Sequence, residues 1–200
     1  DEDLSVMRAA SRYFITGSGR AQLPIILFMA LINFIYYPYF IFSQSSFKDL
    51  GLSVESVAWV FAIAQFVISI GYFSCNKLPK KYRLNIVFIL CPILLAGLYV
   101  ISQLGSLSFM IGVFFIICFI DALISPIYVN HLNQTFESKI RAFSNSFDSF
   151  IQTVFISIGF YLYGELSTRY GFSIVVQCSF VFPLLAVILS SKYLAKIRVT

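Results

Sequence analysis

Charged residues are scarce in this chain. Only 12% of its 200 residues are Asp, Glu, Lys or Arg, whereas 59% are hydrophobic. A soluble domain usually carries about 25% charged residues, because its surface has to face water. The composition therefore excludes an ordinary soluble domain and favours a protein whose solvent is lipid.

Cysteine and histidine are too few and too scattered to build a metal site. The four cysteines stand singly with no CxxC spacing, and His131 is the only histidine. A structural zinc site needs four such ligands, so we expect no bound metal. The chain also lacks a Gly-rich nucleotide loop, an HExxH motif and a membrane-embedded Ser with a His partner. We therefore expect no cofactor, no catalytic residue and no enzyme activity.

Long apolar runs are what the chain has instead. Most contain about 20 residues, and a helix of that length spans about 30 Å, the hydrocarbon thickness of a bilayer. Strands would need strict alternation over about 10 residues, which is absent. We predict an all-α integral membrane protein with six transmembrane helices within 23–189. They are expected at Leu23–Phe42, Val54–Phe73, Ile86–Ile101, Leu107–Tyr128, Ser144–Tyr163 and Phe172–Leu189.

Lys and Arg are distributed unevenly between the two sides that six spans define. Of the 14 such residues, all but Lys48 and Arg169 lie on the side that holds both ends of the chain. The positive-inside rule places that side in the cytoplasm. We thus expect a multi-pass protein of the cell membrane with a cytoplasmic linker at 1–22 and a cytoplasmic basic tail at 190–200. The linker is expected to contain a short interfacial helix around Leu4–Tyr13.

The start and the net charge of the chain carry two further expectations. The chain begins Asp1-Glu2-Asp3, with no Met and no basic segment before an apolar run. This start predicts a fragment or an internal domain without a signal peptide. The net charge of +5 is explained by the basic residues that mark the cytoplasmic side of the membrane. We therefore do not expect nucleic acid as a partner.

Two acids lie inside the apolar runs. Asp121 is roughly 10 Å from Tyr128, and Asp148 is about 6 Å from Ser144, at 1.5 Å of rise per residue. Carboxylates are rare and costly inside a membrane, so they are functional candidates by default. A carboxylate that takes a proton from one side and releases it to the other couples transport to a proton gradient. Asp121 and Asp148 are therefore candidate proton-coupling residues.

A structural role remains open for both acids. Asp121 could be hydrogen-bonded to Ser125 or to the backbone near Pro126. Asp148 lies near a predicted helix start, where the helix dipole and Arg141 would stabilise it without any role in transport.

Single polar residues in the apolar runs are candidates for lining a substrate cavity. Asn145, Asp148 and Gln152 follow at i, i+3 and i+7, which places them on one helix face. Such a face turns toward protein or water rather than lipid, so cavity lining and helix–helix hydrogen bonding both account for it. The full set of cavity candidates is Asn33, Tyr36, Gln65, Asn145 and Gln152. His131 is expected just past the fourth helix, as a solvated loop residue.

Four motifs carry a resemblance to a known family. Residues Phe47-Lys-Asp-Leu-Gly-Leu-Ser53 look like its entry into helix 8, and 76–83 are similar to its basic loop between helices 8 and 9. Ser125-Pro126, Asn133, Arg141-Ala142 and Ser144 resemble its passage from helix 10 to helix 11, and 164–171 resemble its helix 11 ending. The departures are Asn76 for Gly, a missing Gly before Arg83, and Thr168 for Asp. In this order the motifs resemble the C-terminal half, helices 7–12, of a major facilitator superfamily transporter.

The resemblance implies a partner and a function. Such transporters have two six-helix halves, and their substrate binds between the halves near the midplane. The chain would then need the N-terminal half or a second copy of itself, besides membrane lipid, protons and a small-molecule substrate. No Lys or Arg lies mid-span, so cationic or neutral substrates fit better than anions. We expect half of a secondary active transporter for proton-coupled export of small lipophilic or cationic compounds. The alternatives are a proton-coupled uptake symporter for a small nutrient and a non-transporting membrane partner subunit.

Overall fold

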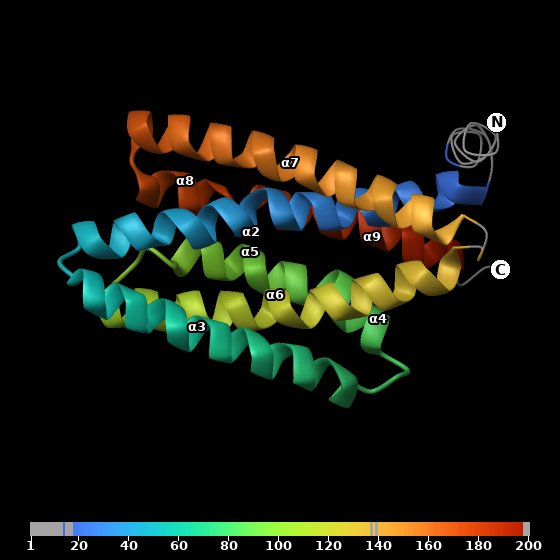
Figure 1. Cartoon of the computed structure of the whole chain (residues 1–200), viewed down its shortest axis with the longest axis horizontal. Helices are drawn as coiled ribbons and strands as arrows, with labels where there is room; N and C mark the ends of the chain where they lie inside the picture. The colour runs from blue at the N-terminus through green and yellow to red at the C-terminus, as the bar shows by residue number, and fades with distance from the viewer. Residues whose placement is uncertain (1–13, 15–17, 137, 139, 198–200) are drawn as a thin grey trace.

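Long helical segments run side by side, in alternating directions, in a computed structural model of the chain that describes residues 14, 18–136, 138 and 140–197 (Figure 1). The interfacial helix expected around Leu4–Tyr13 lies outside these residues. The elements are η1 (Ser18–Gln22), α2 (Leu23–Asp49), α3 (Val54–Ser74), η2 (Cys75–Lys77), α4 (Arg83–Asn85), η3 (Ile86–Leu90), α5 (Cys91–Ile101), α6 (Leu107–Thr135), α7 (Arg141–Tyr170), α8 (Phe172–Cys178) and α9 (Val181–Ile197).

Five helical stretches of the described chain are long and apolar enough to cross a membrane. They are Gly19–Asp49, Val54–Lys77, Arg83–Ile101, Leu107–Thr135 and Phe172–Ala195. The predicted all-helical, membrane-compatible class is therefore confirmed. Helix α7 has 30 residues and is also long enough, but it is too polar to stand among these five. A helix of this kind needs protein or water beside its polar face.

The helices extend beyond the apolar runs that predicted them. Helix α6 continues to Thr135, so the prediction that His131 lies in a loop is wrong. Helix α9 continues to Ile197, so most of 190–200 is helix rather than tail. Residues 18–22 of the predicted linker form the 3-10 helix η1. Apolar composition marks the hydrocarbon layer, whereas backbone hydrogen bonding continues past it.

Local signals at the ends of the helices match the sequence. The Ser53 hydroxyl accepts a hydrogen bond from the Ser56 N–H at 3.1 Å and caps α3, as expected for a Ser at this position. Gly171 separates α7 from α8 with a φ of 86°, a conformation that other residues rarely adopt. The sixth predicted span is further divided, because α8 ends at Cys178 and α9 begins at Val181.

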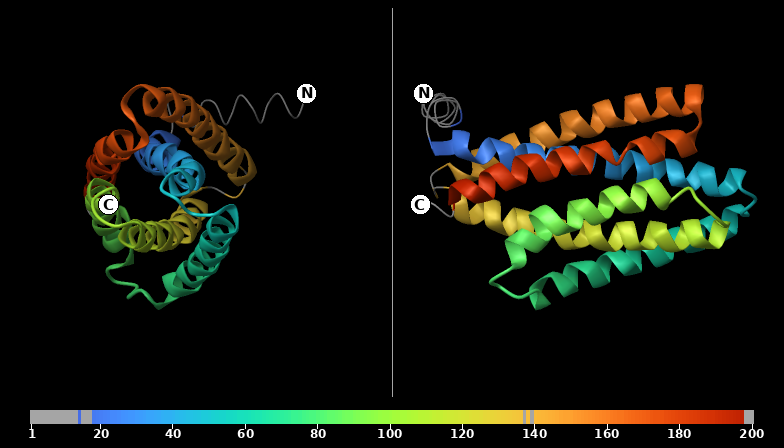
Figure 2. Two further views of the ribbon diagram at one scale, coloured as in Figure 1. Left: turned by 90° about the vertical axis from the view of Figure 1, so that its left-hand side faces the viewer. Right: turned by 180° about the vertical axis from the view of Figure 1, so that it is seen from behind.

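The helices form two three-helix units with the same internal order. The first unit is α2, α3 and α4–η3–α5, and the second is α6, α7 and α8–α9. Each unit passes along the bundle three times in alternating directions, so the second unit begins at the end of the bundle opposite to the start of the first (Figure 1). Helix α2 packs along α7, α6 packs along α3, and α5 packs along α9. These three pairings are unchanged when the units are exchanged, as in an inverted repeat, whereas α2 packs along α9 more extensively than its counterpart α6 packs along α5 (Figure 2).

The α2–α7 contact and the α3–α6 contact each place a glycine of one helix against a partner helix that contains a proline. A Cβ at Gly159 of α7 would overlap the carbonyl oxygen of Phe34 in α2, and one at Gly71 of α3 would overlap Ala122 in α6. Pro38 lacks the N–H that would bind the Phe34 carbonyl, so this oxygen is available to the Gly159 Cα–H. Small residues allow such close approach between membrane helices.

The third helices of the two units are joined by a buried hydrogen bond. Pro92 follows the π-helical turn η3 and cannot donate to the carbonyl of Phe88, four residues earlier. The Ser190 hydroxyl of α9 donates to this carbonyl oxygen instead. Ser and Thr side chains commonly satisfy backbone groups that proline frees inside a membrane. Ser190, placed in the predicted tail, thus belongs to the packed core.

Gly159→Ala should destabilise the protein, because the added methyl group overlaps the Phe34 carbonyl in the α2–α7 crossing. We expect a loss of about 1–3 kcal/mol, measured by circular dichroism during unfolding in mixed detergent–SDS micelles. The matched control is Gly112→Ala in α6, where a Cβ meets nothing within 4 Å. That change should be neutral or stabilising by up to about 1 kcal/mol. Equal stability of the two variants would contradict the close crossing.

The orientation of the bundle can be tested with introduced cysteines. The α3–α4 and α6–α7 connections lie at one end, and the α2–α3 and α7–α8 connections lie at the other (Figure 1). In a Cys178→Ser background, which removes the one exposed cysteine of the described chain, Asp49→Cys should react with a membrane-impermeant maleimide in intact cells. Lys80→Cys should react only after permeabilisation, because the basic end is predicted to be cytoplasmic. The opposite labelling pattern would invert the assigned topology.

Candidate functional site

A cavity of about 300 Å³ lies between α2, α3, α6 and α7. Its lining residues come from both three-helix units, so it lies at the junction of the repeat. They are Met29, Asn33, Tyr36, Tyr37 and Phe40 of α2; Gln65, Ile68 and Tyr72 of α3; Asp121, Ser125, Tyr128 and Val129 of α6; and Gln152 of α7. Four of the five predicted cavity residues are therefore brought together here.

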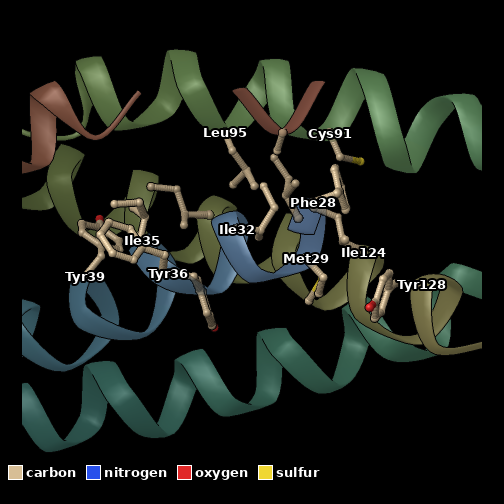
Figure 3. Packing of buried hydrophobic residues seen from close by; sticks show 14 of the residues in the cluster. Phe28, Met29, Ile32, Ile35, Tyr36, Tyr39, Cys91, Leu95, Ile124 and Tyr128 are labelled. Carbon is tan, nitrogen blue, oxygen red and sulfur yellow. The ribbon is translucent and has the colours of Figure 1, made fainter. Parts of the chain in front are cut away.

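The two faces of α2 explain how the cavity arises. Met29, Asn33, Tyr36 and Phe40 recur at spacings of four, three and four residues, which places them on one face. On another side of α2, Ile32 and Ile35 are buried in the hydrophobic cluster. In Figure 3 the side chains of Met29 and Tyr36, which belong to the same buried cluster, point toward α3. Helix α2 thus contributes residues to both the hydrophobic cluster and the cavity wall.

Asp121 is the single ionisable acid among the described residues that line the cavity. Its side chain is 7% exposed, and its Oδ1 atom is buried without a hydrogen-bond partner in the described chain. No described hydrogen bond joins its side chain to Ser125 or to the backbone near Pro126, so neither form of the structural role considered for this residue is seen. A buried carboxylate oxygen without a partner is costly, which makes this atom the exception in the site.

Asp148, in contrast, has partners for both carboxylate oxygens. The Tyr128 hydroxyl donates to Oδ1, and the Gln152 amide donates to Oδ2 at 2.8 Å. Gln152 in turn accepts a hydrogen bond from the Asn33 side chain at 2.6 Å. This polar chain joins α6, α7 and α2. Asp148 has no ion pair with Arg141 in the described chain, where the one salt bridge is Arg169–Glu165.

Two predicted residues lie elsewhere. Asn145 does not line the cavity; it donates to Asn133 Oδ1 at 3.0 Å, near the α6–α7 connection. The polar face of α7 therefore makes two separate sets of hydrogen bonds. Asn145 bonds to Asn133, whereas Asp148 and Gln152 belong to the polar chain with Tyr128 and Asn33. His131 is half-buried, and its Nε2 lies 2.9 Å from the Tyr193 hydroxyl. This contact ties α6 to α9 outside the cavity.

Three of the four tyrosines in the cavity wall were not identified from the sequence. Tyr36 was expected there, whereas Tyr37, Tyr72 and Tyr128 also contribute to its wall. Tyrosines equally suit the membrane–water interface, so their presence in apolar runs was no evidence for a cavity. The useful signal was spacing, because Asp121, Ser125 and Tyr128 recur at four and three residues along α6.

The cavity wall is not closed by a contact between α3 and α7, because these two helices do not pack closely together. Tyr37 and Tyr72 on its rim are 44% and 47% exposed, and Gln65 is also exposed. A polar opening of this kind is unfavourable against lipid. It is favourable against water or against another protein.

Comparison with protein-family models, with curated proteins and with solved structures gave no match. The resemblance to the major facilitator superfamily therefore stays a prediction.

The polar chain predicts that Asn33 and Gln152 are energetically coupled. Gln152→Ala should destabilise the protein by about 1–3 kcal/mol, because it leaves an Asp148 carboxylate oxygen without a donor. A double-mutant cycle with Asn33→Ala should give a coupling of about 0.5–1.7 kcal/mol. Unfolding in mixed micelles measures both values. Thr153→Ala is the control on the exposed side of α7, and additive effects of the paired substitutions would contradict the hydrogen bond.

Proposed function

We propose that this chain is a membrane-transport domain, one half of a secondary active transporter of the major facilitator type, and that it works by proton-coupled export of small lipophilic or cationic compounds. The carrying observation is the cavity at the repeat junction, with an unpartnered buried carboxylate in its wall. A transport site needs a polar compartment within the membrane and a group whose charge changes during the cycle. The cavity supplies the polar compartment, and we propose Asp121 as the group whose charge changes.

The inverted repeat supports the transporter type. Halves of major facilitator transporters are built from two three-helix units of inverted topology. The pairing of α2 with α7, of α6 with α3, and of α5 with α9 has this arrangement. A channel or a structural subunit does not require such internal symmetry. The evidence for the repeat comes from how the helices pack, and it is independent of the sequence motifs.

The exposed sides of α3 and α7 support a second six-helix domain as partner. Small or polar exposed residues recur every three to four positions on both helices, beside the cavity opening. They are Ala58, Ala62, Gln65 and Ser69 on α3, and Ser146, Ser149, Thr153 and Ser157 on α7. Small residues let helices approach, and polar ones bond across an interface. The partner is the missing N-terminal half or a second copy of this chain.

The charge of the cavity favours cations or neutral compounds over anions. None of its described lining residues is Lys or Arg, whereas binding sites for phosphates and carboxylates usually contain such residues. This feature does not separate export from uptake, since both directions use the same site. Export is the direction that we propose.

Asp121→Asn should abolish proton-driven transport, because an amide cannot exchange a proton with either side. In proteoliposomes with an imposed pH gradient, ethidium, a small lipophilic cation, should accumulate with the unmodified protein. Its accumulation should fall at least about tenfold with the variant, whereas exchange of ethidium without a gradient continues.

Asp49→Asn at the exposed end of α2 makes the same chemical change outside the cavity and should transport normally. Unchanged gradient-driven accumulation by Asp121→Asn would show that this residue does not couple transport to protons. Silence of the unmodified chain, relieved only by a six-helix partner, would show that the second half is a different polypeptide segment and not a second copy of this chain.

A further inference from the structure

The cavity wall contains the acidic side chain of Asp121 and no described basic side chain that would balance its negative charge. Asp121 is buried, its Oδ1 has no described partner, and none of the described lining residues is Lys, Arg or His. A buried carboxylate that stays ionised needs a counter-charge or hydrogen-bond donors, since its desolvation costs several kcal/mol. The protein supplies neither at this atom. Asp121 can therefore hold either a proton or the positive charge of a cation that occupies the cavity.

The rest of the wall is largely aromatic. Tyr36, Tyr37, Phe40, Tyr72 and Tyr128 line the same space as Asp121. The Tyr36 ring lies beside those of Tyr37 and Phe40, with centroid separations of 5.6 and 6.0 Å. Aromatic faces attract cations, and quaternary ammonium groups in particular are bound in such aromatic surroundings. The ring faces would surround the positive charge of a bound cation, and the Asp121 carboxylate would balance that charge.

Metal cations fit this wall poorly. Ca²⁺ takes six to eight oxygen ligands, and Mg²⁺ needs a near-ideal octahedron. The cavity offers one carboxylate among rings and amides, and the described chain contains no cluster of metal-ligating side chains. An organic cation carries its own apolar body, which the aromatic rings, Met29 and Ile68 can surround.

Among the described residues that line the cavity, one carboxylate is available to balance the charge of a ligand. Asp148 does not line the cavity, and its oxygens are occupied by Tyr128 and Gln152. The Gln152 amide is itself occupied by Asn33 and Asp148. Gln65, on the rim, is a further polar side chain that can select for a polar substituent. Asp121 alone is left to balance a positive charge.

We propose that the cavity binds an organic monocation, with its ammonium group against the Asp121 carboxyl group and its aromatic or branched alkyl body against the tyrosine rings. This assignment rests on the proposed function for its role in transport and narrows the substrate class of the same site. Asp121 is the counter-ion, and the rings select for charge and shape. Neutral compounds of the same shape are poor ligands.

Equilibrium binding of two isosteres tests this proposal without any transport. The protein is placed in lipid nanodiscs, and binding of radiolabelled benzyltrimethylammonium is measured directly. Its neutral isostere, neopentylbenzene, in which carbon replaces the charged nitrogen, is measured as a competitor. We expect saturable binding of the cation and at least about tenfold weaker binding of the neutral compound. Equal affinity for the two compounds, or no saturable binding of the cation, overturns the proposal.

Substitutions distinguish the contribution of the Asp121 charge to cation binding from that of the aromatic rings. Asp121→Asn should weaken cation binding at least about tenfold and leave the affinity for the neutral isostere unchanged, whereas Asp49→Asn should change neither. Tyr72→Phe should bind normally, and Tyr72→Leu, which removes the ring at a half-exposed position, should weaken binding about two- to fivefold. Unchanged cation binding by Asp121→Asn refutes its role as counter-ion.

The outcomes distinguish this proposal from the proposed function. Asp121-dependent cation binding without transport of any compound in the assembled protein supports the site and contradicts the transport function. Transport of neutral compounds with Asp121-dependent coupling, but without a preference for the charged isostere, supports the transport function and contradicts the cation site.

Discussion

Polar groups inside a bilayer need partners within the protein, because lipid offers none. Most of the structure satisfies this constraint. The carbonyl of Phe88, which Pro92 cannot serve, receives the Ser190 hydroxyl, and the carboxylate of Asp148 receives Tyr128 and Gln152. Asp121 is the one described residue lining the cavity between α2, α3, α6 and α7 that has a buried side-chain oxygen without a described partner. Its unpaired state is the strongest pointer to what the cavity holds.

The inverted arrangement of the two three-helix units explains why the cavity is where it is. Close crossings at Gly71 and Gly159 bring α3 against α6 and α7 against α2. The pairs leave α3 and α7 apart, and the space between them is lined by one face of α2 and one of α6. A symmetric framework thus produces an asymmetric wall, with the carboxylate of Asp121 in one unit and most of the tyrosines in the other.

Much of the fold and part of the site followed from the sequence, for physical reasons that can be named. Apolar runs of bilayer length predicted the helices, and lone polar residues such as Asn33, Gln65 and Asp121 predicted the cavity. Hydropathy could not predict where helices end beyond the hydrocarbon, so His131 was misplaced. Helical spacing could not show which residues meet across helices, so Asn145 was assigned to the cavity although it pairs with Asn133.

The central claim is that one carboxylate, Asp121, holds either a proton or an organic cation. Proton release into weakly buffered solution, counted as benzyltrimethylammonium binds to the protein in nanodiscs, tests it most directly. The account predicts release of up to one proton per bound cation with the unmodified protein and no release with Asp121→Asn. Equal release from both proteins, or cation binding with no release at any pH, would contradict it.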